Sequence, residues 1–298
     1  MPEIVSCPLC GNRRSTPYAM RNRENYPHVS RSFCRECRIA FSNPMATEKE
    51  LRTFYSKYYD KGGFGSAQSK RKMIDLKRDW EKKKEGDRRK ELASFATYYR
   101  LSRPAGKLLD VGCGLGRSLF FAGELGYDVA GLDYDDDAIR FCRDIVPRAV
   151  LVVGDLLDAH LSGESFDNII VNHVLEHVRN PRSFVRELHR LLKPAGTLFV
   201  GTPNLEATAY RLYRLTMFLS ARIPSIVDGV EHTVVFSKEG LARFITSEHF
   251  AILHHRIEGH TESFATIRNS EDGFLHKCLR VIQRFARINQ VLICTKIP

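Results

Sequence analysis

A short glycine-rich stretch, LDVGCGLG at residues 109–116, holds residue types that could bind a ligand. Three glycines, Gly112, Gly114 and Gly116, follow Asp110 closely, and glycines so placed let the backbone turn tightly and a ligand come near. The spacing G-x-G-x-G differs from the dinucleotide fingerprint G-x-G-x-x-G, and Asp110 would repel a phosphate. A carboxylate beside a bare loop suits a cationic ligand, so the stretch predicts S-adenosylmethionine, which carries a sulfonium and an ammonium group.

Polar side chains also stand at the ends of the predicted strands that follow this loop. Asp133 lies about twenty residues beyond the glycines, where a carboxylate accepts hydrogen bonds from the ribose of an adenosine cofactor. Asp155 follows the third predicted strand, where it could accept from the adenine amino group, and Asn172 ends the fourth. Ligands of open α/β sheets bind at this edge, so the set predicts one cofactor site.

Two C-x-x-C pairs lie near the N-terminus, in the stretches CPLC and CREC. Each pair can place two thiolates on one metal ion, and two pairs complete the closed, tetrahedral coordination of a structural zinc site. The predicted ligands are Cys7, Cys10, Cys34 and Cys37. Reduced thiols without a metal are the alternative. The remaining cysteines have no metal spacing and are predicted to be small core residues: Cys113, Cys142, Cys278 and Cys294.

The composition is that of a globular chain, with 298 residues of which 43% are hydrophobic. No apolar run approaches the ~18–20 residues that cross a bilayer, and no apolar stretch follows a basic N-terminus, so we expect a cytoplasmic protein. The net charge of +11 favours acidic partners: nucleic acid, an anionic membrane surface or a phosphorylated substrate. A solvated basic surface without such a partner is the alternative.

The chain divides by pattern into three regions. We expect a zinc ribbon over 1–45, an aromatic and charged helical linker over 46–104, and an α/β domain over 105–298 with an acceptor lid at about 205–232. Helical spacing in the linker is interrupted at Gly86. In the last region strands and helices alternate, which predicts a mostly parallel sheet covered by helices on both faces.

The lid contains a segment from Ala207 to Ile226 that is apolar on most sides. Its arginines could bind a substrate phosphate: Arg211, Arg214 and Arg222. A helix of this kind could instead dock on an anionic membrane as a peripheral contact.

Residues from about 105 to 205 resemble a class I S-adenosylmethionine-dependent methyltransferase. The stretches that carry the resemblance are LLDVGCGLG, GLDYDDDAI, GDLLD, FDNIIVNHVLEHVRNP and LLKPAGTLFVGTPN. The resemblance implies a Rossmann-like seven-stranded sheet whose last strand is antiparallel. It also implies a set of cofactor-binding residues: Asp110, Gly112, Cys113, Gly114, Gly116, Asp133, Tyr134, Asp155, Leu156, Asn172 and His173.

The flanks resemble a narrower group. The stretches CPLCG, CRECRIAFSNP and FYSKYYD are similar to the zinc-ribbon methyltransferases of sugar, glycan and natural-product tailoring. VEHTVVFSKEGLARFI is similar to the E-H-x-x-x-F-S segment of sugar C-methyltransferases, which implies that Glu231 and His232 serve in deprotonation. Gly229 and Val230 replace the tyrosine and the extra histidine of that family, and its large C-terminal domain is lacking, so methylation of a hydroxyl is favoured over methylation of carbon or nitrogen.

Methyl transfer to a hydroxyl needs alignment of donor and acceptor and a base tuned near neutral pH, a task that suits histidine. The candidate bases, in order, are His232, His173 and His177. Glu176 and His177 could also bind a divalent metal, as in some quinone O-methyltransferases with a similar segment.

Two further functions stay open. An RNA methyltransferase fits the charge and the zinc ribbon, although NHVL stands where base-amine methyltransferases of this fold usually carry an N-P-P-Y-like tetrapeptide. A zinc-ribbon adaptor with a non-catalytic methyltransferase domain is the other. The expected partner is a small-molecule or glycan acceptor rather than nucleic acid, and the sequence indicates no oligomeric state.

Overall fold

The computed structural model of the chain describes most of the predicted α/β region and the ribbon. The described residues are 5–18, 25–47, 49–51, 53–54, 66–101, 106–208, 210, 229–258 and 288–297. The arginines predicted to bind phosphate, and most of the predicted lid, lie outside them, as does Cys278.

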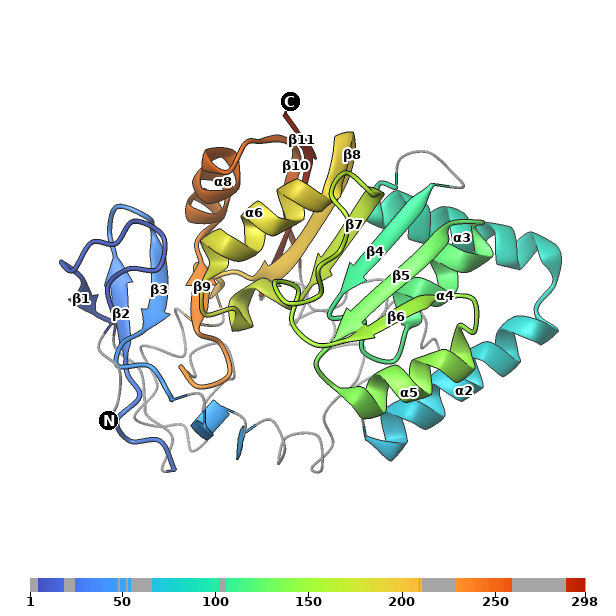
Figure 1. Cartoon of the computed structure of the whole chain (residues 1–298), viewed down its shortest axis with the longest axis horizontal. Helices are drawn as coiled ribbons and strands as arrows, with labels where there is room; N and C mark the ends of the chain where they lie inside the picture. The colour runs from blue at the N-terminus through green and yellow to red at the C-terminus, as the bar shows by residue number, and fades with distance from the viewer. Residues whose placement is uncertain are drawn as a thin grey trace. The chain divides into compact units, whose positions relative to one another are not determined.

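Seven strands form the main sheet, in the order β10-β11-β8-β7-β4-β5-β6 (Figure 1). The pairs β4–β5, β4–β7 and β5–β6 are parallel. The chain therefore runs outward from β4 through β5 to β6 and then returns to the other side of β4, which is the topological switch point at which open α/β sheets bind ligands. The bounds are β4 Lys107–Val111, β5 Asp128–Asp133, β6 Val150–Val153, β7 Phe166–Asn172, β8 Leu192–Pro203, β10 Phe250–Glu258 and β11 Asn289–Lys296. The predicted seven-stranded mixed sheet is confirmed.

Burial explains why the central strands read as nearly continuous apolar runs. All but the first residue of β4 and the last of β7 are buried, as expected for parallel strands covered on both faces. Strand β6 lies at the sheet edge, and its terminal residues Val150 and Val153 are exposed.

Helices alternate with these strands. They are α4 Arg117–Glu124, α5 Asp136–Ile145, α6 Pro181–Leu191 and α8 Lys238–Ser247, with a short 3-10 helix, η1, at Leu175–His177. Helix α5 begins where Asp135 caps it, because the Asp135 carboxylate accepts from the backbone N–H groups of Asp137 at 2.9 Å and Ala138 at 3.2 Å. Such a cap satisfies donors that the first helical turn leaves without partners.

The charged linker forms two helices, α2 Ala67–Lys82 and α3 Glu85–Tyr99. The break falls at Lys83 and Lys84, just before the predicted Gly86. Trp80 anchors α2, since its indole N–H donates to Glu124 at 2.8 Å and its ring packs edge-on against Phe121. The linker is therefore tied to the helix that follows the glycine loop.

A second sheet of four strands contains the ribbon, in the order β1-β2-β3-β9. Its strands are β1 Thr16–Pro17, β2 Arg31–Cys34, β3 Ile39–Ser42 and β9 Val234–Phe236. All three pairings are antiparallel. Strand β9, almost 200 residues further along the chain, completes the sheet of the ribbon, and no pattern in the sequence predicts this pairing.

The chain forms two compact units. One consists of Met1–Leu51, His173–Val185 and Val200–Leu292, and the other of Arg52–Asn172, Arg186–Phe199 and Ile293–Pro298. The boundaries predicted at 45 and 104 remain predictions.

No helix within the described parts of the chain is long and apolar enough to cross a membrane.

Candidate active site

The glycine loop takes the conformation that its residue types predict. Gly112, Gly114 and Gly116 all have positive φ, at 73°, 50° and 80°, a region that glycine enters without steric cost. The N–H of Gly112 donates to the Leu132 carbonyl at 2.7 Å, which ties the loop to the end of β5. A Cβ added to Gly114 would meet no heavy atom within 4 Å, whereas one on Gly116 would collide with the Cys142 sulfur. Gly114 therefore borders open space and Gly116 is required for packing.

Two carboxyl groups lie at this loop. Asp133 accepts from the N–H of Gly114 at 2.7 Å and from that of Asp135 at 3.0 Å. Asp110 is buried, and burial together with the charge of Asp133 raises the pKa of Asp110 to about 8, although the Ser118 hydroxyl lowers it. Burial also raises the pKa of Asp133. Carboxyl groups that resist ionisation together are relieved by a cation beside them, and this is the charge that the predicted cofactor carries.

The predicted adenine-side residues surround the end of β6. The Tyr134 hydroxyl donates to the Asp155 carboxylate, whose other oxygen accepts from the N–H of Leu157 at 2.7 Å. Tyr134 is largely exposed and Leu156 is buried. The structure thus places the sequence-predicted residues at the carboxyl ends of β4, β5, β6 and β7, and their contacts to a cofactor remain predictions.

A second group of polar side chains begins at the residue after β7. His173 has a positive φ of 58°, and its Nδ1 lies 3.1 Å from one carboxylate oxygen of Glu176. The other oxygen of Glu176 accepts from the Thr202 hydroxyl at 3.0 Å. The Glu176 side chain is fully buried, whereas that of His173 is 40% exposed. A buried carboxylate therefore holds one ring nitrogen of a histidine that reaches the surface.

The electrostatics of this pair favour its charged form. Burial opposes ionisation of Glu176, but the hydrogen bond from His173 and the nearby histidine charges outweigh it and hold the pKa of Glu176 at about 2. For His173, burial lowers the pKa, but the hydrogen bond and charge of Glu176 raise it above its usual value. Glu176 is therefore ionised at neutral pH, and it strengthens the basicity of His173.

The environment of His232 has the opposite effect. This side chain is 7% exposed, and burial, with the charge of His177, lowers the pKa of His232 to about 3. Its Nδ1 is buried without a hydrogen-bond partner among the described residues. Its ring centroid lies 4.9 Å from that of His177. His232 is therefore neutral at physiological pH and is a weak base in this surrounding.

His177 is fixed by the backbone of the segment that contains His232. Its Nδ1 lies 2.7 Å from the carbonyl oxygen of Glu231, and because a carbonyl only accepts, Nδ1 carries the proton. Glu231 thus joins the group through its backbone, and its side chain is buried.

The same region meets the spacing requirement for a metal ion. Ligand atoms of Glu176, His177 and His232 all lie within 4.8 Å of one another. Both oxygens of Glu176 already take part in hydrogen bonds, so an ion would compete with His173 and Thr202 for them. The expectation of a divalent metal at Glu176 and His177 stays a prediction, for which His232 offers a third side chain.

Comparison with known proteins agrees with the arrangement at the glycine loop. Residues 109–200 match the methyltransferase domain family. This part of the chain is therefore similar to the methyltransferase domain of S-adenosylmethionine-dependent enzymes. The match begins at the glycine loop and ends within β8, so it includes every predicted cofactor-binding residue.

Curated relatives resemble the methyltransferase domain over part of their length. A ubiquinone biosynthesis O-methyltransferase of Glaesserella parasuis is 38% identical over 115 residues, which are 36% of this chain and 49% of the relative. A probable S-adenosylmethionine-dependent methyltransferase of Mycolicibacterium smegmatis is 36% identical over 109 residues, covering 36% of this chain and 42% of the relative. The chain spans less than half the length of either protein.

Solved structures share the fold at low identity. A protein of Pyrococcus horikoshii superposes with a TM-score of 0.52 at 19% identity, covering 81% of this chain and 99% of that one. A second similar chain comes from the complex between the Haloferax volcanii Trm112 methyltransferase activator and the putative methyltransferase. It superposes with a TM-score of 0.54 at 16% identity, covering 79% of this chain and 96% of that one. These similarities show the fold of the methyltransferase domain.

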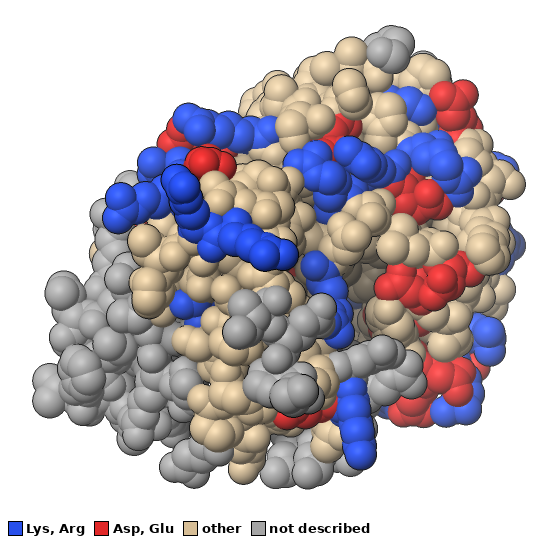
Figure 2. All heavy atoms as spheres, turned by 60° about the vertical axis from the view of Figure 1, so that its left-hand side comes forward, with Lys and Arg blue, Asp and Glu red and all other residues tan. Residues whose placement is uncertain are grey.

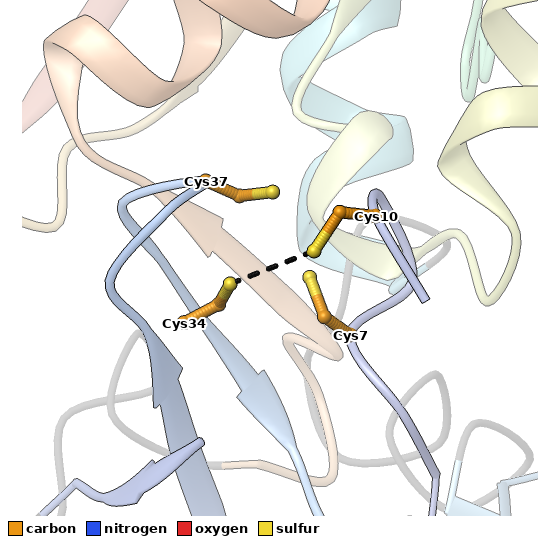
Figure 3. Close-up of side chains that lie close together, drawn as sticks. All are labelled: Cys7, Cys10, Cys34 and Cys37. Carbon is orange, nitrogen blue, oxygen red and sulfur yellow. Dashed lines mark hydrogen bonds between the residues drawn. The ribbon is translucent and has the colours of Figure 1, made fainter. Parts of the chain in front are cut away.

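The four predicted zinc ligands converge on one point, and Figure 3 shows their sulfur atoms pointing toward one another. All four sulfurs lie within 4.8 Å of one another, and those of Cys10 and Cys34 are 3.8 Å apart. None of the four forms a disulfide. The arrangement is compatible with a zinc ribbon, which lies outside the residues that match the methyltransferase domain family.

The thiols fit a metal cation for an electrostatic reason. Burial raises the pKa of Cys7 to about 12. It also raises the pKa of Cys37, and the other cysteines of the cluster add to this rise. Thiolates crowded in this way need a positive charge among them, and zinc supplies it in sites of four cysteines.

Basic residues on the surface alternate with acidic ones. Figure 2 shows Lys and Arg side chains over the face that lies on the left of Figure 1, with Asp and Glu side chains among them. Some pair locally: Arg38 contacts Glu206 at 3.2 Å and Glu239 at 2.9 Å. Acidic side chains on this face therefore neutralise part of its positive charge.

Several residues near the His173–Glu176 pair were missed by sequence reasoning. Thr202 lies near the end of β8, where the strand-end argument that selected Asn172 could have found it. The sequence suggested Glu176 only as a metal ligand. Its hydrogen bond to His173 could not be predicted, because that contact depends on the 3-10 turn of η1. Thr233 and Arg31, described below, carry no signal in the sequence.

Proposed function

We propose that the protein transfers the methyl group of S-adenosylmethionine to a hydroxyl of a sugar-like or natural-product acceptor that bears phosphate. The pair of His173 and Glu176 is the observation that carries the proposal for a hydroxyl acceptor. It joins a buried, ionised carboxylate to a surface-reaching imidazole, which is the arrangement of a general base.

The cofactor fits the residues of the glycine loop. Open space beside Gly114 leaves room for a ligand, and the carboxyl groups of Asp110 and Asp133 favour a positive charge. Bound there, S-adenosylmethionine supplies the methyl group from its sulfonium. Asp133 would accept hydrogen bonds from the ribose, and Asp155 with Leu156 would hold the adenine, as the resemblance to class I methyltransferases implies.

His173 is the base that we propose for the acceptor hydroxyl. Its Nδ1 is held by Glu176, which leaves Nε2 to accept the hydroxyl proton as the oxygen–methyl bond forms and the sulfur–methyl bond breaks. Glu176 then stabilises the imidazolium. His232 was the first candidate from the sequence, but its lowered pKa of about 3 suits a neutral hydrogen-bonding side chain better than a base.

The acceptor class rests on two supports. Similarity of the ribbon and of the 231–237 stretch to tailoring methyltransferases suggests a sugar or natural product, and the net charge of +11 favours a phosphate on it. The ubiquinone biosynthesis O-methyltransferase among the relatives is consistent with an oxygen acceptor. We also propose structural zinc at the cysteine cluster. The proposal is supported by the convergence of the four sulfur atoms and by the raised pKa values of Cys7 and Cys37.

The test measures release of S-adenosylhomocysteine with phosphorylated sugars and phenolic natural products as acceptors, followed by mass spectrometry of the methylated product. We expect an O-methyl product, and His173→Ala should lower turnover ~10²–10⁴-fold while calorimetry shows unchanged affinity for S-adenosylhomocysteine. Full activity of His173→Ala, or methylation at carbon or nitrogen, would overturn the assignment.

A divalent metal is the second candidate role for the Glu176 region, because three possible ligands lie within 4.8 Å of one another there. If that role is correct, turnover should need added Mg²⁺ or Mn²⁺ after treatment with a mild chelator that leaves the cysteine site loaded. Turnover that is independent of such ions supports the histidine base.

A further inference from the structure

A buried segment of five residues, Gly229–Thr233, connects the ribbon with the turn that carries Glu176. All five residues are buried. The segment contains Glu231 and His232 and leads directly into β9, which pairs with β3 of the ribbon. We call it the 229–233 segment.

The ribbon holds the 229–233 segment by three hydrogen bonds besides the β3–β9 pairing. Arg31 in β2 donates from Nη2 to the His232 carbonyl at 2.5 Å. Ser42, the last residue of β3, donates from its hydroxyl to the Gly229 carbonyl at 2.5 Å and from its N–H to the Thr233 carbonyl at 2.9 Å. Both ends of the segment and its centre are therefore fixed by ribbon residues.

On its other side the segment fixes the turn η1. The Thr233 hydroxyl lies 3.1 Å from the carbonyl oxygens of both Glu176 and Val178. His177 donates from Nδ1 to the Glu231 carbonyl at 2.7 Å. These contacts hold the backbone on which the Glu176 carboxylate is mounted, and that carboxylate holds His173.

Arg31 is a costly residue in this position. It is 1% exposed, and burying a guanidinium has a large desolvation penalty that hydrogen bonds must offset. An apolar residue could fill the same space without that penalty. The hydrogen bond from Arg31 to the His232 carbonyl at 2.5 Å is a directional contact that an apolar residue of the same size could not make.

We infer that the ribbon positions the proposed base: Arg31 and Thr233 are positioning residues that, through the 229–233 segment, set the orientation of Glu176 and so of His173. This inference rests on the proposed function for the role of His173. Arg31 stands three residues before Cys34 in the same strand, so the metal that we propose for the cysteines would hold the strand from which Arg31 reaches. The glycine loop and its hydrogen-bond partners lie outside the segments involved.

The first test replaces one hydroxyl. Thr233→Val removes the contacts to Glu176 and Val178 and keeps the shape of the side chain closely. We expect kcat to fall at least tenfold with unchanged affinity for S-adenosylhomocysteine by calorimetry. The rising limb of the pH profile should also move to lower pH, because a displaced Glu176 no longer raises the pKa of His173. Arg31→Lys should lower kcat in the same way, and Arg13→Lys, at an exposed position of the ribbon, serves as the matched control.

A second measurement does not depend on activity. Hydrogen exchange of the full chain, with zinc loaded at the cysteines and after its removal, should show faster exchange in 173–178 and 229–233 without zinc and unchanged exchange in 110–116. Thr233→Val should reproduce the faster exchange in 173–178 with zinc present.

The outcomes separate the inference from the proposed function. Unchanged kcat and exchange in both Thr233→Val and Arg31→Lys would overturn the inference, as would parallel losses of kcat and cofactor affinity, which indicate general destabilisation. If His173→Ala is fully active but zinc removal still alters exchange in 173–178, the proposed base is wrong and the positioning of the turn by the ribbon stands.

Discussion

Asp110, which we propose as a cofactor-binding residue, opposes the stability of the ligand-free protein above its unfolded pKa. Its carboxyl group is 4% exposed, and burial raises its pKa from 3.8 to about 8. Because the folded protein binds the Asp110 proton more tightly than the unfolded chain does, this proton adds to the free energy of unfolding. The contribution is complete below the unfolded pKa and is lost as the pH rises through the folded pKa. A bound cation would relieve the penalty, so stability and binding make opposite demands on this residue.

Asp110→Asn tests this balance. The amide keeps the shape of the side chain without an ionisable group. The melting temperature of the variant, relative to that of the wild type, should therefore increase as the pH rises from about 4 to about 8. Affinity for S-adenosylmethionine should fall ~10–100-fold, the loss of a charge-assisted hydrogen bond. Thermal unfolding and calorimetry measure the two effects, with exposed Asp144→Asn as control. A variant that binds as tightly as the wild type would remove Asp110 from the cofactor site.

The His173–Glu176 pair makes a prediction about pH. His173 must be neutral to accept a proton, so turnover should rise with pH through its raised pKa. Glu176→Gln removes the carboxylate that stabilises the imidazolium, so the rising limb should shift to lower pH while kcat falls ~10²-fold or more, because the ring is no longer oriented. The measurement is kcat against pH, with Glu239→Gln on α8 as control. A limb that does not move would show that another group titrates.

At the scale of elements, the glycine loop combines a proposed ligand surface with a packing contact. Gly114 and Gly116 both have positive φ, but only Gly116 lacks room for a side chain, because Cys142 of α5 lies against it. The loop therefore depends on the neighbouring helix for its shape. Likewise the ribbon depends on β9 for its last strand, and η1 depends on the segment before β9.

Alanine at each of these two glycines should separate the two roles. Each substitution costs about 1–2 kcal/mol for the left-handed conformation, and Gly116→Ala adds the collision with Cys142. We therefore expect Gly116→Ala to have the lower melting temperature, while Gly114→Ala remains folded but binds S-adenosylhomocysteine weakly, since its methyl group enters the open space. Unfolding curves and calorimetry on both variants test this. Equal stability of the two would contradict the packing role of Gly116.

At the scale of the whole molecule, a net charge of +11 would favour RNA, yet acidic side chains lie among the basic ones on the face in Figure 2. We expect S-adenosylmethionine to bind with the same affinity with and without bulk RNA, and any RNA binding to weaken steeply with salt. Calorimetry at two salt concentrations measures both. RNA that strengthens cofactor binding would instead favour an RNA methyltransferase, since such coupling is reciprocal.

Much of the methyltransferase domain could be predicted because its signals are local. The apolar runs of β4 and β7, the glycines after β4 and the carboxylates at strand ends are each contained in a few residues. The two cysteine pairs are equally local, since a C-x-x-C turn presents its thiols whatever surrounds it. Parallel strands then bring separate ends to one edge, so the residues predicted to bind the cofactor could be grouped without a structure.

The sequence by itself therefore determined the seven-stranded α/β domain, the polar residues at the carboxyl ends of its strands and the convergence of Cys7, Cys10, Cys34 and Cys37. Only the tertiary structure decided that the pKa of His173 is raised and that of His232 lowered, because both depend on burial and on charges that the fold brings together. It alone also joined Arg31 to His232, which lie 201 positions apart. Periodicity and spacing describe neighbours along the chain, whereas electrostatic surroundings and strand partners arise when distant segments pack together.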